Sequence, residues 1–350
     1  MNNMAERTGS LGDARSEPRR TERGEARSEP ARPGRNEAGR GRLDEAARAA
    51  WLYYVARNTQ DEIAAKLGVS RQAAQRLVAR AVAEGLVNVR IDHPIADCLA
   101  AADEMQATFG LERAIVVPSD PSGSSGTLGL AEEGAAEIER WLRRRTPLVI
   151  GMGTGRTLKA AVSHLPPMDC PHHRIVSMTG SIAPDGSAAF YNVIFSMAER
   201  VNAPHFPMPV PVFASHPKER ETLREQSAVR IPLELAAQAD VVFVGIADTG
   251  PDAPFVLDGF MTAARAKDLR ARGAAGEICG WVFDEHGQLL PSPSNRRVVS
   301  APLPDPKRTK VVGMGMGERK RIAIRAALRG RLFSTLLTDE ATARWLVANS

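Results

Sequence analysis

Apolar residues recur at helical spacing in the N-terminal part of the chain. From Leu43 the segment LDEAARAAWLYYVARN gathers its apolar residues on one side of a helix, and residues 60–67 predict a second, shorter helix. Gly68 suits the left-handed position that ends a helix, and Ser70 is a good cap for the next one, RQAAQRLVARAVAEG. The pattern therefore predicts helices joined by a tight glycine turn.

The last of these helices carries side chains that suit contact with DNA. Two short helices around a tight turn are typical of a helix-turn-helix, and Arg and Gln can pair with guanine and adenine edges in the major groove. A helical hairpin with a charged solvent face would have the same periodicity, but no carboxylate lies among the outward residues at the helix start. We therefore expect binding to double-stranded operator DNA. The predicted contact residues are Ser70, Arg71, Gln72, Gln75 and Arg76.

The pattern changes after His93-Pro94. Residues 95–110 predict one more helix, and from Arg113 short apolar runs alternate with helical stretches. The runs are AIVVP, LVIGMG, RIVSMTGS, VPVFAS, ADVVFVGIAD, GEICGWVFD, RRVVSAP and TKVVGMGMG. Such alternation predicts an α/β domain, doubly wound around a mainly parallel sheet. We expect a disordered tail over 1–41, a helix-turn-helix domain over 42–92, a linker or oligomerisation helix over 93–112 and the α/β domain over 113–350.

Polar loops follow several of the predicted strands. In LVIGMGTGRTL a strand ends near Ile150, Gly151 to Gly155 form a loop, and a helix opens at Arg156. Backbone N–H groups and Thr hydroxyls at such a helix start can hold a phosphate or sugar hydroxyls. The spacing is neither GxGxxG nor a P-loop, and glycines after a strand are also found in simple tight turns. Similar small or polar residues follow other strands, in MTGS, DTG and GMGERK. Because parallel α/β sheets bind ligands beyond the carboxyl ends of their strands, these loops predict a pocket for a hydroxylated ligand.

Composition narrows the class of protein. Of the 350 residues, 43% are hydrophobic and 25% charged, which is typical of a soluble globular chain. The formal charge of +5 gives mild support for a polyanionic partner. Residues 1–41 are rich in Arg, Glu, Gly, Pro and Ser, which predicts disorder; an arm along the DNA backbone is the alternative. The three cysteines are far apart, and no long apolar run or secretory signal is present, so we expect a cytoplasmic protein without membrane contact, metal or cofactor.

Taken together, these segments resemble a known family. TQDEIAAKLGVSRQAAQRLVARAVAEGLVNVRI is similar to the helix-turn-helix of the SorC family of bacterial sugar-responsive transcriptional regulators. IGMGTGRTL, GEICGWVFDEHG, the Gly180-Ser181 loop and VVGMGMGERKRIAIRAALRGRLFSTLLTDEATARWL resemble its effector domain, so that the resemblance covers residues 43–348. That domain is itself similar to sugar-phosphate isomerases and deaminases.

The resemblance implies a homo-oligomeric regulator, a dimer or tetramer, in which a sugar, polyol or sugar phosphate alters operator binding. It implies an anion-side loop and a set of residues facing the rest of the ligand. The implied effector-binding residues are Gly153, Thr154, Gly155, Arg156, Thr157, Gly180, Ser181, Asp248, Glu277 and Lys320. The chain departs from the family pattern at Glu277, where Asp is common, and Met314 and Met316 flank the last glycine loop. Phosphorylated and unphosphorylated ligands both remain open.

Two other functions fit parts of the pattern. The loops would also serve a sugar-phosphate isomerase or deaminase with an attached helical domain, in which Asp248, Glu277 and Lys320 supply acid–base groups. The DNA-binding domain, which an isomerase does not need, favours a non-enzymatic regulator. A DNA-binding protein with a vestigial pocket is the third possibility.

Two groups of aromatic residues are expected to have structural roles. Tyr191 and its neighbours Phe190 and Phe195 lie at helical spacing, which favours core packing over a ligand platform. Trp51, Tyr53 and Tyr54 are expected to pack within the DNA-binding domain or between subunits.

Overall fold

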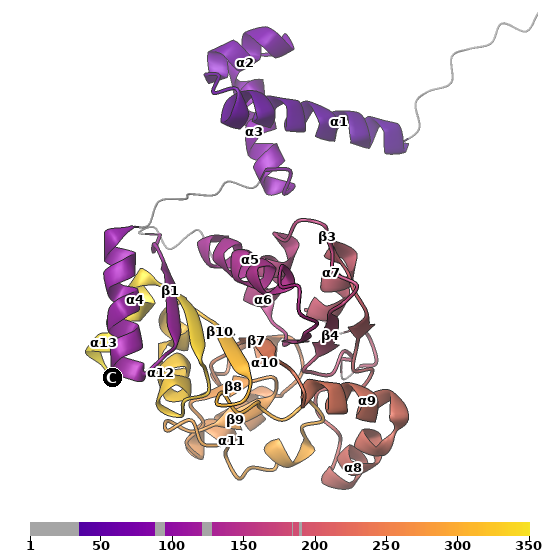
Figure 1. Ribbon diagram of the computed structural model, residues 1–350, viewed down its shortest axis with the longest axis vertical. Helices are drawn as coiled ribbons and strands as arrows, with labels where there is room; N and C mark the ends of the chain where they lie inside the picture. The colour runs from indigo at the N-terminus through magenta and orange to yellow at the C-terminus, as the bar shows by residue number, and fades with distance from the viewer. Residues whose placement is uncertain (1–34, 88–94, 121–127, 184, 189–190) are drawn as a thin grey trace, which may run out of the picture. The chain divides into compact units, whose positions relative to one another are not determined.

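The computed structural model of the chain describes residues 35–87, 95–120, 128–183, 185–188 and 191–350 (Figure 1). It divides into two compact units, residues 1–87 and 88–350, each considered by itself. Most of the expected tail, and the junction at 88–94, lie outside the described residues.

The smaller unit is a bundle of short helices. Its elements are α1 (Arg35–Ala50), the single-turn π-helix η1 (Trp51–Val55), α2 (Gln60–Leu67) and α3 (Arg71–Ala83). The first helix begins at Arg35, before the Leu43 expected from the apolar pattern, so residues 35–41 of the predicted disordered tail are helical. Ala49, Ile63, Ala74 and Val78 form a small buried core. Packing of α2 and α3 around this core fixes the direction in which α3 presents its outer face.

The larger unit is built on a seven-stranded sheet in which every pairing is parallel. The strand order is β1 (Arg113–Val117), β11 (Thr335–Asp339), β10 (Lys310–Met314), β7 (Val241–Gly245), β2 (Val149–Met152), β4 (Arg174–Ser177) and β6 (His205–Phe206). Two small sheets pair β3 (Met168–Asp169) with β5 (Val201–Asn202), and β8 (Gly276–Ile278) with β9 (Trp281–Phe283).

Helices cover both faces of the large sheet (Figure 1). One core contains residues of α5 (Leu128–Leu142), α6 (Arg156–Ser163) and α7 (Val193–Arg200). The other contains residues of α4 (Ala96–Phe109), α9 (Ser227–Ala236), α12 (Arg321–Arg329) and α13 (Glu340–Ala348). Central strand β7 serves both, since Val241 and Phe243 belong to the first core and Val242 and Val244 to the second. The expected doubly wound α/β fold is confirmed.

The remaining helical elements lie in the connections between strands. They are α8 (Pro217–Glu225), α10 (Pro254–Leu257), α11 (Ala263–Ala271), η2 (Asn295–Arg297) and η3 (Glu318–Lys320). Among the described residues, no helix combines the length and apolar character needed to cross a membrane.

Several strand predictions need correction. VPVFAS and RRVVSAP form only isolated bridges, Ile182–Pro211 and Phe213–Val298, because prolines in and beside the first run remove backbone donors that a ladder needs. GEICGWVFD is a tight antiparallel hairpin, β8–β9, with Cys279 and Gly280 at positive φ in its turn. The apolar pattern did not predict the short strands β3, β5 and β6, nor β11.

The strand order reverses between β2 and β7. From β2 the chain moves outward to β4 and β6, and from β7 it moves the opposite way to β10 and β11. The connections leaving the carboxyl ends of β2 and β7 therefore diverge, and such a switch point is the usual ligand crevice of an open parallel sheet.

Candidate ligand pocket and nucleic-acid interface

The loop after β2 is held tightly at the switch point. The Gly153 N–H donates to the carbonyl of Phe243 on β7 at 2.8 Å. A Cβ at Gly153 would lie 3.0 Å from that same oxygen, and one at Gly245 would lie 2.9 Å from the Thr154 carbonyl. Glycine at both positions lets the β2 and β7 ends approach closely.

Gly155 gives this loop its exit into helix α6. Its φ of 122° and ψ of 162° are accessible essentially only to glycine. No side chain caps the helix, so its first backbone N–H groups face the loop. Gly317 before η3 has a similar conformation, φ 96° and ψ 155°. The loops after β2 and β10 therefore each lead into a helix through a glycine in this conformation, next to the crevice.

Arg156 spans two segments that are distant in sequence. Its Nε donates to the Tyr191 hydroxyl at 2.7 Å, and its Nη2 lies 3.7 Å from Asp258 Oδ1. The Thr154 hydroxyl donates to the Tyr191 carbonyl at 2.7 Å. Tyr191, expected in the core, therefore helps to position the loop after β2.

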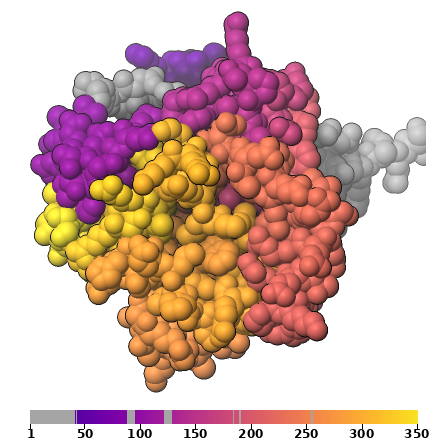
Figure 2. Space-filling model, turned by 60° about the horizontal axis from the view of Figure 1, so that its bottom comes forward, coloured from indigo at the N-terminus to yellow at the C-terminus, as the bar shows by residue number. Residues whose placement is uncertain are grey.

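A cavity of about 550 Å³ opens beside this arginine. Tyr191 and Asp258 line it, together with the loop around Asp185 and Ser187 and the segment Leu257–Phe260. In Figure 2 the orange and yellow C-terminal segments lie beside the salmon middle of the chain on one face of the molecule. The volume is in the range of small-molecule sites.

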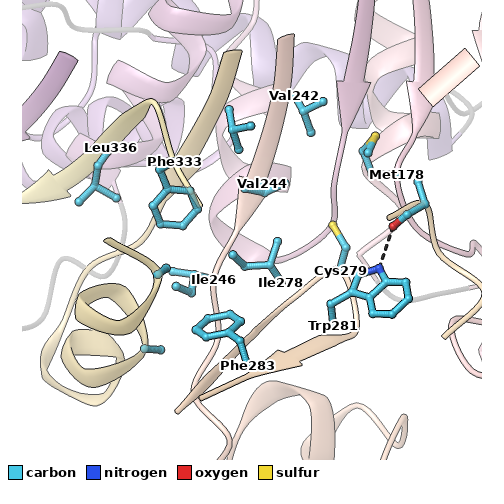
Figure 3. Close-up of a cluster of buried hydrophobic side chains, with 14 of the residues drawn as sticks. Met178, Val242, Val244, Ile246, Ile278, Cys279, Trp281, Phe283, Phe333 and Leu336 are labelled. Carbon is cyan, nitrogen blue, oxygen red and sulfur yellow. Dashed lines mark hydrogen bonds between the residues drawn. The ribbon is translucent and has the colours of Figure 1, made fainter. Parts of the chain in front are cut away.

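Asp248 and Glu277 are brought together by the backbone. Ala247 and Glu277 exchange two N–H···O bonds of 3.1 and 3.0 Å, which place the β8 hairpin beside the end of β7. Figure 3 shows the hairpin packed against the sheet: Ile278 and Phe283 lie among buried side chains of the sheet, and Trp281 lies beside Cys279. The Trp281 indole N–H donates to the Ala301 carbonyl at 2.8 Å.

Burial changes the acid–base character of this cluster. It raises the pKa of Glu277 to about 7, although a bond from the Gly280 N–H and the charge of Lys320 act in the opposite direction. Burial lowers the pKa of the Lys320 ammonium, while Asp248 and Glu277 raise it. Arg156 and Arg319 also lower it by repulsion. Glu277 in β8 and the charged groups that follow β2, β7 and β10 therefore act on one another.

Arg319 is paired as well. Its Nη2 lies 3.5 Å from Asp248 Oδ2 and donates to the Asp252 carbonyl at 2.7 Å. The predicted residues from the different strand ends are thus assembled at one edge of the sheet, with carboxylates opposite the cations.

Three of the predicted residues contribute mainly to packing. A Cβ at Gly180 would collide with the backbone at Val210 and Pro211. The Ser181 hydroxyl is buried and donates to the Met208 carbonyl at 2.9 Å. Thr157 is only 4% exposed. Their role as ligand contacts stays a prediction, and the geometry favours a supporting one.

Sequence reasoning did not select Asp258 or Asp185. Asp258 lies just after α10, in FVLDGF, and Asp185 lies in a turn where its carboxylate accepts from the Ser187 hydroxyl and N–H. Asp185 comes shortly after the second polar loop and Asp258 lies well beyond the third, and neither residue belongs to a loop that the pattern selected. The position of Tyr191 after the second polar loop could have indicated a role at the site, but its helical spacing with Phe190 and Phe195 favoured core packing.

The outer face of α3 is the candidate DNA interface. Ser70 caps the helix by accepting from the Ala73 N–H at 3.2 Å. Gln72, Gln75 and Arg76 are exposed. Arg71 pairs loosely with Asp61 at 3.6 Å, with both side chains 70% exposed, and such pairs contribute little. These side chains are therefore available to a partner.

Helix α2, which leads into the turn before α3, is capped at both ends. Gly68 ends α2 in the left-handed conformation, and Thr59 and Glu62 form a capping box at the start of α2.

The aromatic residues of η1 do not pack into the small core as expected. Trp51, Tyr53 and Tyr54 are 57%, 39% and 39% exposed. Within the described residues, no group of His, Cys, Asp and Glu side chains is suited to hold a metal ion.

Comparison with known proteins agrees with this arrangement. Residues 93–348 match the family of sugar-binding domains called Sugar-bind, and residues 49–94 match the MarR family. The erythritol catabolism regulatory protein EryD of Brucella abortus is 34% identical over 303 residues, which cover 86% of this chain and 96% of EryD. The transcriptional regulator LsrR of Klebsiella pneumoniae is 29% identical over 308 residues, covering 86% and 92% of the two chains.

A solved structure extends the likeness to the whole architecture. The crystal structure of the full-length sorbitol operon regulator SorC from Klebsiella pneumoniae matches with a TM-score of 0.64 at 25% identity, over 87% of this chain and 99% of that chain. Both units of the chain therefore have counterparts in one regulator. The chain belongs to the SorC family of bacterial sugar-responsive transcriptional regulators.

Proposed function

We propose that the chain binds operator DNA through α3 and that a sugar or polyol in the pocket at the β2–β7 switch point changes this binding. The observation that carries the proposal is the assembly of Arg156, Asp248, Glu277 and Lys320 at that crevice. On the DNA side, the predicted contacts are Ser70, Arg71, Gln72, Gln75 and Arg76. Operator DNA and effector are the partners, and we place the protein in the cytoplasm with its DNA.

The proposed ligand class is a small hydroxylated compound. Carboxylates can accept hydrogen bonds from neighbouring hydroxyls, and the ammonium of Lys320 can donate to their oxygens. The backbone N–H groups at the start of α6 supply further donors. Relatives named for erythritol catabolism and for a sorbitol operon support this class.

Regulation requires that the ligand bind two states of the protein with different affinity. We propose that the protein is a homo-oligomer and that α4, which follows the DNA-binding unit in sequence, transmits the change. Helix α4 packs against β1 and α13, so a shift of the sheet edge moves it. The spacing of two α3 helices on operator half-sites would change accordingly.

An enzyme is the second candidate. A carboxyl whose pKa is about 7 beside a lysine is a pair suited to proton transfer, as an isomerase needs. Against this, the Glu277 carboxylate is buried and accepts from its own hairpin at Gly280. We propose that the pocket is a non-catalytic sensor and that Glu277 shapes it.

Fluorescence anisotropy on a labelled duplex from upstream of the protein's own gene tests the proposal. We expect binding that weakens with salt and that depends on sequence, and an addition of erythritol or sorbitol is expected to change it. A scrambled duplex of the same length and composition is the control. Absence of sequence-dependent binding, or turnover of sugar phosphates by the purified protein, would contradict the proposal.

A further inference from the structure

The cations at the crevice are matched by carboxylates. Arg156 lies 3.7 Å from Asp258, and Arg319 lies 3.5 Å from Asp248. Lys320 is acted on by both Asp248 and Glu277. A further carboxylate, Asp185, lines the cavity next to Arg156. A phosphate dianion bound here would have to compete with these carboxylates for the same cations.

Asp258 pairs with Arg156, the cation that would otherwise be available to a phosphate group. The guanidinium of Arg156 has its Nε on the Tyr191 hydroxyl and its Nη2 toward Asp258. Asp258 is the more enclosed partner, with its side chain 15% exposed against 53% for Arg156. Burial raises the pKa of Asp258, and the neighbouring charge of Arg156 opposes that rise. The carboxylate is therefore fixed at the cavity wall and depends on Arg156 for its charge balance.

We infer that Asp258 is a specificity-determining residue that makes the pocket select an uncharged polyol over its phosphate monoester. The inference rests on the proposed function. A phosphate placed on Arg156 would lie within a few ångströms of the Asp258 carboxylate, and like charges at such distances repel. A hydroxyl group meets no such repulsion, because it can donate to Asp258 and accept from Arg156 at the same time.

Calorimetric titration of the full chain tests the inference. The probes are erythritol, sorbitol, their monophosphate esters and inorganic phosphate. The wild type is expected to bind a polyol at least about tenfold more tightly than its ester, a modest factor for one partly screened charge pair. Asp258→Asn keeps the shape and removes the charge, so it is expected to reduce this preference by about tenfold or more.

Two control variants separate charge from folding. Asp258→Glu retains the carboxylate and is expected to keep a preference for the polyol. Asp268→Asn removes an exposed carboxylate on α11 that is paired with Arg272, away from the cavity lining, and is expected to leave the preference unchanged. Thermal unfolding of each variant establishes that it is folded before titration.

The outcomes are distinct. Tighter binding of the ester by the wild type overturns the inference and leaves the proposed function standing. An unchanged preference in folded Asp258→Asn removes Asp258 from the explanation. If no probe binds the wild type at all, the proposed function fails, and the inference fails with it.

Discussion

Glu277 and Gly280 are joined across the β8–β9 turn: the Glu277 carboxylate accepts a 2.8 Å hydrogen bond from the Gly280 backbone N–H. The bond supports the ionised form of a carboxyl that burial otherwise disfavours, and the pKa of Glu277 still rises from 4.5 to about 7. The charge of Glu277, next to the crevice at the end of β7, therefore changes close to neutral pH.

The first prediction concerns stability and pH. Between pH 4.5 and about 7 the folded state binds more protons at Glu277 than the unfolded state does, so the free energy of unfolding falls as pH rises through this window. Glu277→Gln cannot titrate, and its amide oxygen can still accept from Gly280. The free energy of unfolding of the variant, measured relative to that of wild type, should therefore increase from pH 5 to pH 8, by up to about 3 kcal/mol.

Thermal or urea unfolding of the larger unit at several pH values measures this difference. Glu234→Gln, at an exposed glutamate on α9, controls for the loss of one carboxylate. A constant difference between Glu277→Gln and wild type across this range would show that Glu277 does not titrate there.

The second prediction concerns sequence reading by α3. Gln72→Ala removes an exposed side chain that can pair with adenine, and the loss is expected to be about 1–3 kcal/mol in discrimination against a mismatched operator. No charge is lost, so the dependence of affinity on salt should not change. Anisotropy on matched and mismatched duplexes at several salt concentrations measures both. Gln238→Ala, at an exposed glutamine in the turn after α9, is the control, and equal losses on both duplexes would argue against base contact.

The third prediction separates the two roles of Ser70. Its side chain caps α3 through the Ala73 N–H, so Ser70→Ala should destabilise the smaller unit by about 1 kcal/mol. Ser70→Asp keeps a capping oxygen and should retain stability, but its negative charge would face the DNA backbone. Loss of DNA affinity in the folded Asp variant would place Ser70 at the interface. Normal affinity in that variant would restrict Ser70 to capping.

The sequence was sufficient for most of the fold and for part of the site. Strands such as β7 are apolar on both faces, which made a buried parallel sheet predictable. The run VPVFAS is equally apolar, but Pro211 within it and the prolines just before it prevent a ladder, and apolar content alone did not separate the two. In the site, the sequence pattern identified residues that directly follow predicted strands. Asp258 was not found, because only the tertiary fold brings it opposite Arg156.

The fourth prediction compares two glycines of the pocket loops. Gly155→Ala meets no atom within 4 Å but places a Cβ on a backbone with φ of 122°. Such strain costs about 1–3 kcal/mol, and relief by rotation would move the N–H groups at the start of α6. Gly180→Ala instead forces a Cβ against the Val210 and Pro211 backbone. We expect Gly155→Ala to weaken effector binding more than it lowers the unfolding temperature, and Gly180→Ala to lower that temperature strongly. Calorimetric titration with erythritol and thermal unfolding of both variants measure the contrast. If Gly155→Ala leaves effector affinity intact, the α6 N-terminus does not contact the ligand, and the loop after β2 serves the fold alone.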